Sequence, residues 1–348
     1  MKNRVLAATL LAAVACSNAH AQVTFELIGQ PWEALGGTDI SADGTVIVGN
    51  IVGPYETFRW TIETGAVPLG RATVPVLGGG AGSPNVSHDG TRVSATVTSE
   101  DNTRQVCGVW ENGQWTVCES LPPDAVTIDT SDSDAWGLSG DGQTAVGLYW
   151  RTGGGGSAYP LAYTPDDGLG VRLGPGGPGI NSGRANAANY DGSVIVGWRS
   201  NSVGAWQPTV WENGVETVVE ATPVRCELFG VNPAGTIAVG MTFIPGFDRR
   251  DAAYWTKTPG GWVKTIMGSF PGTVLGQAYG VDLSADGSII VGSNIYTNNP
   301  GGARDAFIWT QALGLVKTRD FLAANGITVD PFFALIEMSA ITPDGRVM

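Results

Sequence analysis

Histidine is almost absent from this 348-residue chain, which contains only His20 and His88. A Ser-His-Asp triad needs its histidine beside a nucleophile and inside a cleft. His88 instead lies in the short segment Ser87-His88-Asp89-Gly90, which reads as a turn, so we interpret it as a solvated turn residue. The same scarcity excludes zinc sites built from three or four histidine and cysteine ligands.

Basic residues and long apolar segments are also scarce. The chain has 19 lysines and arginines against 32 acidic residues, which gives a net charge of −13. Such a surface repels phosphate backbones and anionic lipid headgroups, so nucleic acid is excluded as a partner. Beyond the amino terminus no stretch reaches the roughly 18 apolar residues of a membrane span. We therefore expect no transmembrane segment.

The amino terminus has the pattern of a signal peptide. Lys2 and Arg4 precede the apolar run Val5–Ala15, and Ala19-His20-Ala21 is a small-residue cleavage site. We expect residues 1–21 to be removed and the protein to be secreted, periplasmic or at the cell surface. A lipoprotein anchored through Cys16 is the alternative; it is less favoured because Ala13 is not the usual branched residue three positions earlier.

Only three cysteines remain after that cleavage, Cys107, Cys118 and Cys226. The segment CGVWENGQWTVC reads as a hairpin with a turn at Asn112-Gly113, which places Cys107 opposite Cys118. An oxidising compartment favours a structural disulfide between them. The two residues occupy a hydrogen-bonded pair, however, where the Cα atoms are farther apart. We interpret Cys226 as a small buried apolar residue.

Glycine, in contrast, is abundant. The 51 glycines have no three-residue period, so they indicate many tight turns rather than collagen. One phrase recurs, as ISADGTVIVG at 40–49 and SADGSIIVG at 284–292. We expect each copy to be a hairpin, with its glycine in the left-handed conformation and its branched residues in a strand that the last glycine ends. The turns are expected at Asp43-Gly44, Asp89-Gly90, Asp141-Gly142, Asp191-Gly192, Ala234-Gly235, Asp286-Gly287 and Asp344-Gly345.

A second phrase with a central aromatic residue lies between successive copies, for example Phe58-Arg59-Trp60-Thr61. Each unit thus offers four short strands, which cannot cover their own apolar faces unless neighbouring units stack. This pattern is typical of propeller blades. We predict an all-β propeller of four-stranded antiparallel blades in a single domain, residues 22–348. Seven blades are favoured over six, with the strand Val23–Ile28 and the last phrase Ile341–Met348 sharing one blade.

These phrases resemble the bacterial HAF-type extracellular repeat proteins from Ala34 to Met348. The segment Asp305-Ala306-Phe307-Ile308-Trp309-Thr310 is similar to the motif that names the family, with Asp305 in place of its histidine. The stretch from Arg319 resembles the end of such arrays, with a short helix at 319–324 and a closing strand. The family's last phrase continues to an Ile-Val-Gly ending, so a truncated chain and an incomplete last blade are both open. The resemblance implies export and a propeller-like fold, but no particular reaction.

No catalytic residue and no cofactor is assigned. The acidic residues of the turns are explained by the turns, which leaves Glu100, Glu119, Asp166 and Asp248 as free acids. Asp129, Asp132 and Asp134 form an acidic loop in which calcium is an open alternative to simple solvation. The loop lacks a third ligand at Trp136 and a bidentate glutamate at Gln143, so solvation is favoured.

Tryptophan is the last candidate for a binding residue. Trp60, Trp110, Trp211, Trp255 and Trp309 share one position of the repeat and are expected in the core. Six others are irregular and could line a channel mouth and stack on sugar rings, although packing between blades is favoured; these are Trp32, Trp136, Trp150, Trp198, Trp206 and Trp262.

Three functions remain open. We favour an exported, monomeric, non-enzymatic propeller that binds a protein or a glycan through its loops. The alternatives are a carboxylate-dependent hydrolase of polysaccharide and a segment of a structural surface protein.

Overall fold

The computed structural model describes residues 23–28, 35–51, 56–71, 82–127, 131–151, 157–174, 182–297 and 302–348. The predicted signal peptide, Cys16, Trp32 and Asp129 lie outside these residues. The strands are β1 (Leu35–Ile40), β2 (Ile47–Ile51), β3 (Glu56–Thr61), β4 (Gly65–Pro68), β5 (Asn85–Val86), β6 (Arg92–Thr98), β7 (Gln105–Glu111), β8 (Gln114–Val117), β9 (Ser133–Leu138), β10 (Ala145–Trp150), β11 (Ala158–Thr164), β12 (Leu169–Arg172), β13 (Gly183–Ala188), β14 (Val194–Ser200), β15 (Trp206–Glu212), β16 (Val215–Val218), β17 (Leu228–Val231), β18 (Ile237–Ile244), β19 (Arg249–Thr258), β20 (Gly261–Gly268), β21 (Gln277–Leu283), β22 (Ile289–Ile295), β23 (Arg304–Thr310) and β24 (Gly314–Lys317).

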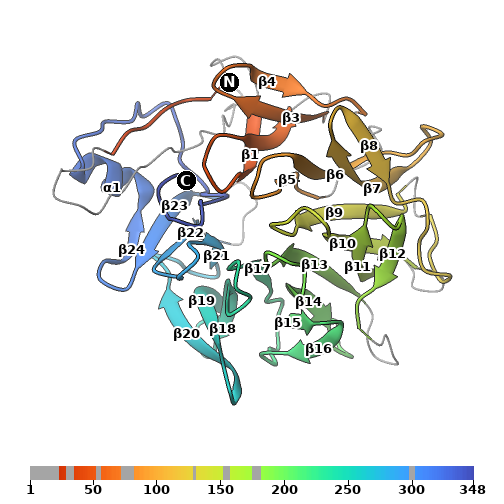
Figure 1. The fold of residues 1–348 in the computed structure, drawn as a ribbon. Coiled ribbons are helices and arrows are strands. Elements are labelled where there is room, and N and C mark those ends of the chain that lie inside the picture. Colours follow the sequence, from red (N-terminus) through yellow and green to blue (C-terminus); the bar gives the residue numbers. More distant parts are fainter. Residues whose placement is uncertain are drawn as a thin grey trace.

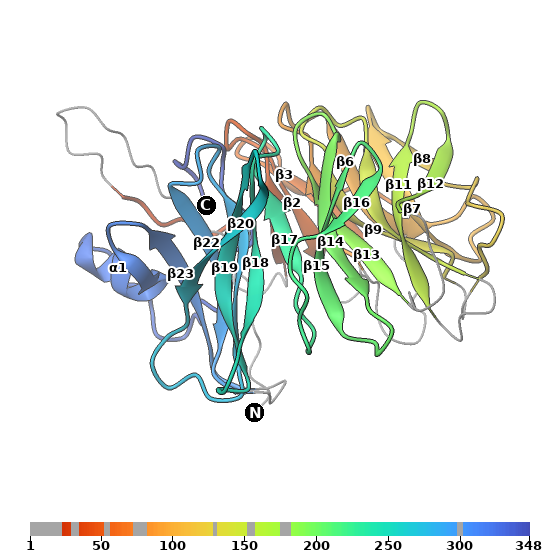
Figure 2. The same ribbon diagram turned by 90° about the horizontal axis from the view of Figure 1, so that it is seen from below.

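These strands form six consecutive antiparallel units of four, as the repeat predicts. The fifth and sixth units share one eight-stranded sheet through a single parallel bridge between Arg250 and Gln277. Figure 1 shows the units arranged radially, with the first strand of each nearest the central axis and the fourth at the rim. Figure 2 shows the same blades from the side. The all-β prediction is confirmed, and the molecule is a β-propeller.

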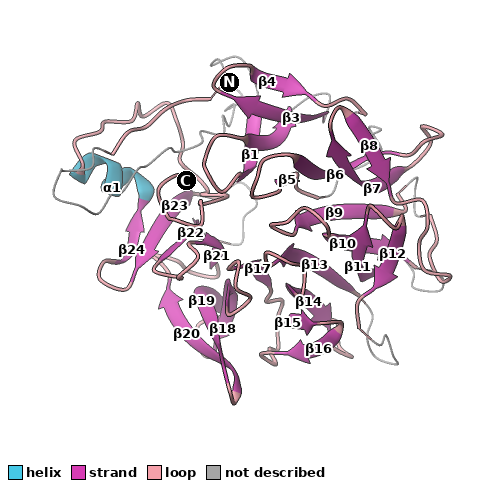
Figure 3. Cartoon of the chain, viewed as in Figure 1, coloured by secondary structure: helices cyan, strands magenta, loops and turns pink. Residues whose placement is uncertain are grey.

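The short helix α1 (Thr318–Ala324) agrees with the predicted helix at 319–324 and follows the outermost strand of the sixth blade (Figure 3). Leu322 packs with Val291, Ala306 and Ile308, so α1 covers the face of the last blade on which the chain ends also pack. The closing strand expected after it does not form, since no strand follows α1 in the chain. In the described residues no helix is both long enough and apolar enough to cross a membrane.

The repeated phrase builds the same turn each time. In the first copy the Asp43 carboxylate accepts hydrogen bonds from the Ser41 hydroxyl (2.7 Å) and the Thr45 N–H (3.0 Å), and Val46 N–H donates to Ser41 Oγ (3.0 Å). The chain reverses at Gly44 with φ of 75°. All seven predicted turn glycines have φ between 67° and 75°, which confirms their left-handed conformation.

The last glycine of the phrase does not end the strand, contrary to expectation. Gly49 lies inside β2, opposite a bulge between Gly37 and Asp39 in β1. A Cβ atom at Gly49 would lie only 1.9 Å from the carbonyl oxygen of Gly36, so this position needs glycine because two backbones approach closely. The same contact, at 1.8 to 2.2 Å, applies to Gly147, Gly197, Gly240 and Gly292. The second unit has Ala95 there, and its first strand β5 pairs over only two residues.

Successive blades are joined through their turns. Backbone hydrogen bonds of 2.8 to 3.1 Å run from one turn to the next, as in Ala42 N–H to His88 O and His88 N–H to Gly140 O; the others are Asp141 N–H to Tyr190 O, Tyr190 N–H to Pro233 O and Ala285 N–H to Pro343 O. Each turn glycine also faces a side chain of the preceding unit. The pairs are Gly90 with Val46, Gly142 with Arg92, Gly192 with Thr144, Gly235 with Val194, Gly287 with Ile237, Gly345 with Ile289 and Gly44 with Val347.

The chain ends lie between the sixth and the first blade. Val23 is buried with Leu322, Ile341 and Met348, and Val347 packs with Ile40 and Ile47 of the first blade. Neither predicted end strand is formed: residues 23–28 and 341–348 are described without regular strand pairing. The last turn does form, closed by the Thr342 N–H to Val347 O hydrogen bond of 2.8 Å. Six blades are thus complete in the described residues.

The disulfide prediction is not met. The predicted register is present, since Glu111 pairs with Gln114 and Cys118 N–H donates to Cys107 O at 2.8 Å. Both thiols are nevertheless free and fully buried, as is Cys226. The hydrogen-bonded register separates the Cα atoms, and Cys118 Sγ is directed to the Ser120 carbonyl at 3.8 Å. Burial raises the pKa of Cys118 to about 12 and holds that of Cys107 well above its usual value, so both stay protonated.

Candidate ligand channel

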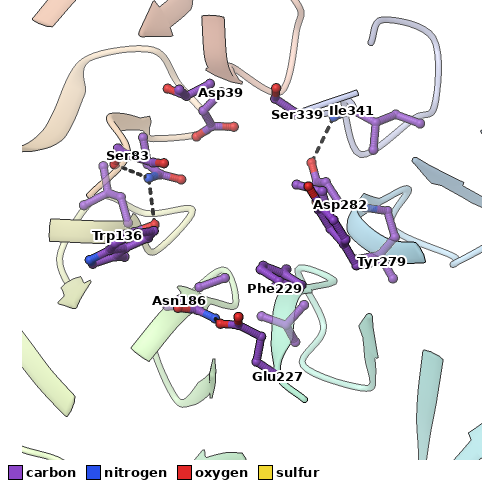
Figure 4. Close-up of a pocket in the computed structure, with 18 of the residues that line it drawn as sticks. Asp39, Ser83, Trp136, Asn186, Glu227, Phe229, Tyr279, Asp282, Ser339 and Ile341 are labelled. Carbon is purple, nitrogen blue, oxygen red and sulfur yellow. Dashed lines mark hydrogen bonds between the residues drawn. The ribbon is translucent and has the colours of Figure 1, made fainter. Parts of the chain in front are cut away.

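A cavity of about 560 Å³ lies on the central axis and is lined by residues of the first strand of every blade. Figure 4 shows these side chains converging from several blades. All six first strands lead directly into a repeated turn, so they run in the same direction. The cavity therefore has two distinct ends, which we call the turn end and the strand-entry end.

The channel positions differ from blade to blade although the turns beside them repeat. Three residues before the first residue of each turn, the chain has in order Thr38, Pro84, Trp136, Asn186, Phe229, Val281 and Ser339. All of these residues except Pro84 line the cavity. Some of these side chains also bond to the next blade, as Thr38 Oγ1 does to the Pro84 carbonyl (2.6 Å) and the Asn186 amide to the Leu228 carbonyl (2.6 Å), but no single residue type is required at this position.

Two carboxyl groups occupy equivalent positions near the turn end. Asp39 and Asp282 each lie two residues before the repeated turn, and both face the cavity (Figure 4). Burial raises the pKa of Asp39 to about 7, and the charge of Asp282 adds to this rise. Burial also raises the pKa of Asp282 to about 6. Both residues are half-buried and line the cavity, so the pair can exchange protons with solvent.

Both carboxyls also join neighbouring chain segments. Asp39 accepts hydrogen bonds from its own following N–H, that of Ile40, and from Val86 N–H in the next blade, each at 2.8 Å. Asp282 accepts in the same way from Leu283 (2.8 Å) and from Ile341 of the last turn (2.9 Å). Each carboxyl thus has a structural role, although its charge has no cationic partner among the described residues.

A charged network lies toward the strand-entry end. The Arg184 guanidinium donates to Glu227 (2.6 Å) and to Asn186 (2.6 Å), and Asn186 also donates to Glu227 (2.9 Å). The same guanidinium lies 3.7 Å from the centre of the Trp136 ring. Asp134 is fully buried nearby without a hydrogen bond to either carboxyl oxygen, and burial raises its pKa to about 7 against the lowering effect of Arg184.

Trp206 holds an arginine at the same end. Its ring stacks on Trp198 with a centroid separation of 3.9 Å and an interplanar angle of 9°. The Arg225 guanidinium lies 4.7 Å from the Trp206 ring centre. Both Arg225 and Trp206 line the cavity, whereas Trp198 is buried beneath. Because the flat faces of Trp206 are occupied, it offers no free platform for a sugar ring.

A phenol–carboxyl pair completes this wall. Tyr279 donates its hydroxyl hydrogen to Glu337 at 2.8 Å, and its ring lies 5.0 Å from that of Phe229. Burial raises the pKa of Glu337, with Tyr279 and the nearby Arg304 acting in the opposite direction. Tyr279, Phe229 and Trp136 thus give the middle of the channel an aromatic wall.

The acids expected from the sequence do not meet in the channel. Glu100 pairs with Arg71 (2.9 Å), Glu119 with Arg104 (3.1 Å) and Asp166 with Arg92 (3.4 Å), and the three acids are exposed. Asp248 lies in an exposed turn with φ of 47°. None of the four lines the cavity.

The calcium candidates are separated. Asp132 pairs with Arg104 and with the Thr127 hydroxyl, Asp134 is buried in the sheet, and Asp129 lies outside the described residues. In the part of the chain that the structure describes, no three acidic, histidine or cysteine side chains converge as metal ligands. Calcium binding stays an untested prediction.

The structure agrees only in part with the interpretations of His88 and of the irregular tryptophans. His88 is half-buried rather than solvated: it lines the turn end of the channel and packs edge-on against Tyr190 at 5.3 Å. Burial lowers its pKa, which favours the neutral imidazole. Trp136 and Trp206 line the channel as one interpretation allowed. Trp150 and Trp262 bond instead to Ser131 and Glu212 away from it.

Sequence reasoning missed Asp39, Asp282, Glu227, Glu337 and Arg225. A signal for the first two was present: aligning the repeats on the turn shows acid at this position in only two copies, where the others have Asn85, Gly137, Ala187, Gly230 and Ala340. Residues that depart from a repeat are candidates for a role that not every blade shares.

Comparisons with known proteins support the fold alone. No protein-family model and no curated protein matches the chain. Among solved structures, a puromycin hydrolase shares 14% identity over 94% of this chain and 55% of its own, with a TM-score of 0.55. The oligogalacturonate lyase of Vibrio parahaemolyticus shares 14% over 80% of this chain and 76% of its own, at 0.51. TolB of Acinetobacter baumannii shares 12% over 79% of this chain and 63% of its own, at 0.50.

Proposed function

We propose that this protein is an exported binding module without catalytic activity of its own, and that its ligand enters the central channel. The observation that carries this proposal is the contrast between repeated turns and individual channel residues around a cavity of about 560 Å³. Export rests on the signal-peptide pattern of residues 1–21. A cavity of this size, with an aromatic wall and a few charged groups, is typical of ligand sites.

Filling the channel tests this function. Ser339 lines the cavity, so Ser339→Trp should obstruct it, whereas Val215→Trp adds the same side chain to an exposed position of β16. Glycans and peptides are screened by thermal shift against the wild type. We expect hits whose stabilisation is lost in Ser339→Trp and kept in Val215→Trp. Hits that both variants retain would place the binding site elsewhere.

A second candidate is a carboxylate-dependent hydrolase of polysaccharide, favoured by the two carboxyls with raised pKa values on one cavity. Their oxygens already accept blade-joining N–H groups, which supports the structural role instead. Because a lyase of similar fold acts on oligogalacturonate, that saccharide is the first substrate to try. We expect no new reducing ends or unsaturated products; their release, abolished in Asp282→Asn, would overturn the non-enzymatic proposal.

We also propose that the chain ends complete the ring as an incomplete seventh blade, and that the chain is a HAF-type repeat protein. Support comes from Val347, which faces Gly44 as Val46 faces Gly90. We expect Val347→Asp to lower the free energy of unfolding by about 1–2 kcal/mol, since it buries a charge in this contact. Val203→Asp, at a site 81% exposed, should cost little. Equal urea midpoints would contradict the closure.

A further inference from the structure

The two ends of the channel carry opposite charge. Asp39 and Asp282 lie near the turn end, and the rim of turns around it carries further carboxylates, whose pKa values are lowered by hydrogen bonds at Asp43, Asp191 and Asp286. Arg225 and Arg250 line the strand-entry end, where Arg250 is level with Gln277 at the start of β21. A ligand that spans the channel therefore meets an acidic and a basic end.

Arg225 is the open cation of the basic end. It lies on Trp206, and Trp206 lies on Trp198, so stacking restrains its plane. Within the described parts of the chain its guanidinium forms neither an ion pair nor a hydrogen bond, which leaves its in-plane N–H donors free. A planar fork of donors is suited to bidentate binding of a carboxylate.

The acids at the same end do not cancel this charge. Glu227 is bound by Arg184 and Asn186, and Glu337 accepts the Tyr279 hydroxyl close to Arg304. Arg250 also lines this end but takes part in an interaction of its own, so the open positive group is that of Arg225.

At the acidic end, negative charge lacks a positive partner. Asp39 and Asp282 share the cavity, and neither has a cationic partner in the residues that the structure describes. Their carboxyls accept backbone N–H groups, and both residues line the channel. An ammonium group at this end would be attracted by both carboxyls and relieve their repulsion.

The wall between the ends is aromatic and apolar, formed by Trp136, Phe229 and Tyr279 with Val231 and Val281. Arg250 is level with Gln277, which precedes Asp282 by five residues in β21, a strand with one bulge between Gly280 and Asp282. At about 3.3 Å per residue, less the residue taken up by the bulge, the two ends are offset by roughly 13–16 Å. An extended peptide of about five residues has the same length.

We propose that the channel binds a short extended peptide with free termini, its carboxylate against Arg225 and its ammonium group between Asp39 and Asp282. This inference rests on the proposed function and names the ligand class for the same cavity. The channel then selects its ligand by the distance between two terminal charges, and small apolar side chains face the aromatic wall.

Alanine peptides of two to seven residues test the length and both ends, with binding to the wild-type protein measured by calorimetry at pH 7. We expect the highest affinity at four to six residues. Acetylation of the amino terminus and amidation of the carboxyl terminus should each weaken binding at least about tenfold, as loss of a charged hydrogen bond does. Binding that is indifferent to both caps, or absent at every length, would overturn the proposal.

Variants assign each end. Arg225→Gln should lose affinity for the free peptide but bind the amidated peptide as the wild type does. The double variant Asp39→Asn/Asp282→Asn should lose affinity for the free peptide but bind the acetylated peptide as the wild type does. Lys257→Gln, which changes an outer-surface cation paired with Glu212, should leave all affinities unchanged. Loss of affinity for every peptide form in Arg225→Gln would contradict the assignment of the carboxylate.

The outcomes also separate this inference from the function beneath it. Glycans that bind the wild type and not Ser339→Trp, without binding of any peptide, would retain the channel as a binding site and reject the peptide. Absence of every channel-dependent ligand would reject both.

Discussion

Each first strand lines the channel and leads into a repeated turn, yet the residues of the turns are nearly constant from blade to blade and those of the channel wall are not. The turns repeat nearly the same residues, with glycine φ values within 8° of one another, from 67° to 75°. The wall a few residues away has a threonine, a tryptophan, a phenylalanine and a serine at equivalent positions. The difference shows that contact between blades requires nearly the same residues in every turn, whereas several residue types at the wall are compatible with blade contact, which leaves room for ligand recognition.

The largest effect should come from the glycines opposite the strand bulges. Gly147→Ala would place a Cβ atom 1.8 Å from the Asp134 carbonyl oxygen, which a backbone shift alone can relieve. We expect a loss of about 3 kcal/mol or more in the free energy of unfolding. Urea denaturation followed by tryptophan fluorescence measures it. A smaller loss in the free energy of unfolding than for alanine at a turn glycine such as Gly287 would show that the bulge adapts easily.

The turn glycines should come next, and a matched pair isolates the contact between blades. Gly287 and Gly314 have φ of 70° and 67°, so alanine costs about 1 kcal/mol of backbone strain at either. Only Gly287 faces a neighbouring side chain, with its Cβ site 2.5 Å from Ile237 Cδ1. We expect Gly287→Ala to lower the melting temperature more than Gly314→Ala. Equal shifts would mean that blade contacts do not constrain the turn.

The channel acids and the turn acids should respond to pH with opposite sign. Asp39 and Asp282 have raised pKa values in the folded state, so they favour folding at low pH and lose that contribution as pH rises from about 4 to 7. Asp191 has a lowered pKa, and its contribution is lost as pH falls below about 4.

The double variant Asp39→Asn/Asp282→Asn should therefore gain stability relative to the wild type as the pH is raised from 4 to 7. Asp191→Asn should be less stable than the wild type at neutral pH, and this difference in the free energy of unfolding should be smallest at the lowest pH. Urea midpoints measured at several pH values between about 2.5 and 7 check both trends. Parallel curves for the double variant and the wild type would contradict the coupling of the two channel carboxyls.

The smallest effect is expected for a single turn carboxylate. Asp43→Ala removes the acceptor of three hydrogen bonds on an exposed turn, at a cost of about 0.5–1 kcal/mol. The fifth blade already has Ala234 at this position, and the Asn232 side chain accepts the Thr236 and Ile237 N–H groups there instead. A melting temperature far below that of the wild type would show that this substitution is not tolerated elsewhere in the ring.

The sequence predicted the elements whose causes are local. Gly44 adopts a left-handed conformation for reasons contained in its own turn, and the third strands carry their aromatic residue at a fixed position. Gly49 was misread because the bulge that requires glycine lies in the partner strand. The end strands were expected from pattern alone, but residues 23–28 contribute buried side chains to the ring without strand pairing.

The channel was hidden for a different reason. Asp39 stands four residues from Asp43 and shares its chemistry, yet one lines a cavity and the other caps an exposed turn. Arg225 precedes its strand, and it can be recognised as a binding residue only once the structure places it on Trp206 of another blade. Such assignments depend on how six strands are placed around one axis, which no single unit encodes.

The contact between Gly44 and Val347 has a consequence for the time course of folding. Every other turn contact joins segments one unit apart, while this one joins residues about 300 positions apart, which raises its loop-closure cost by roughly 1.5–2 kcal/mol. Each blade can fold as its residues become available, but this contact forms only when the last turn reaches the first. A permuted chain opened between two other blades would transfer that late event to the new junction.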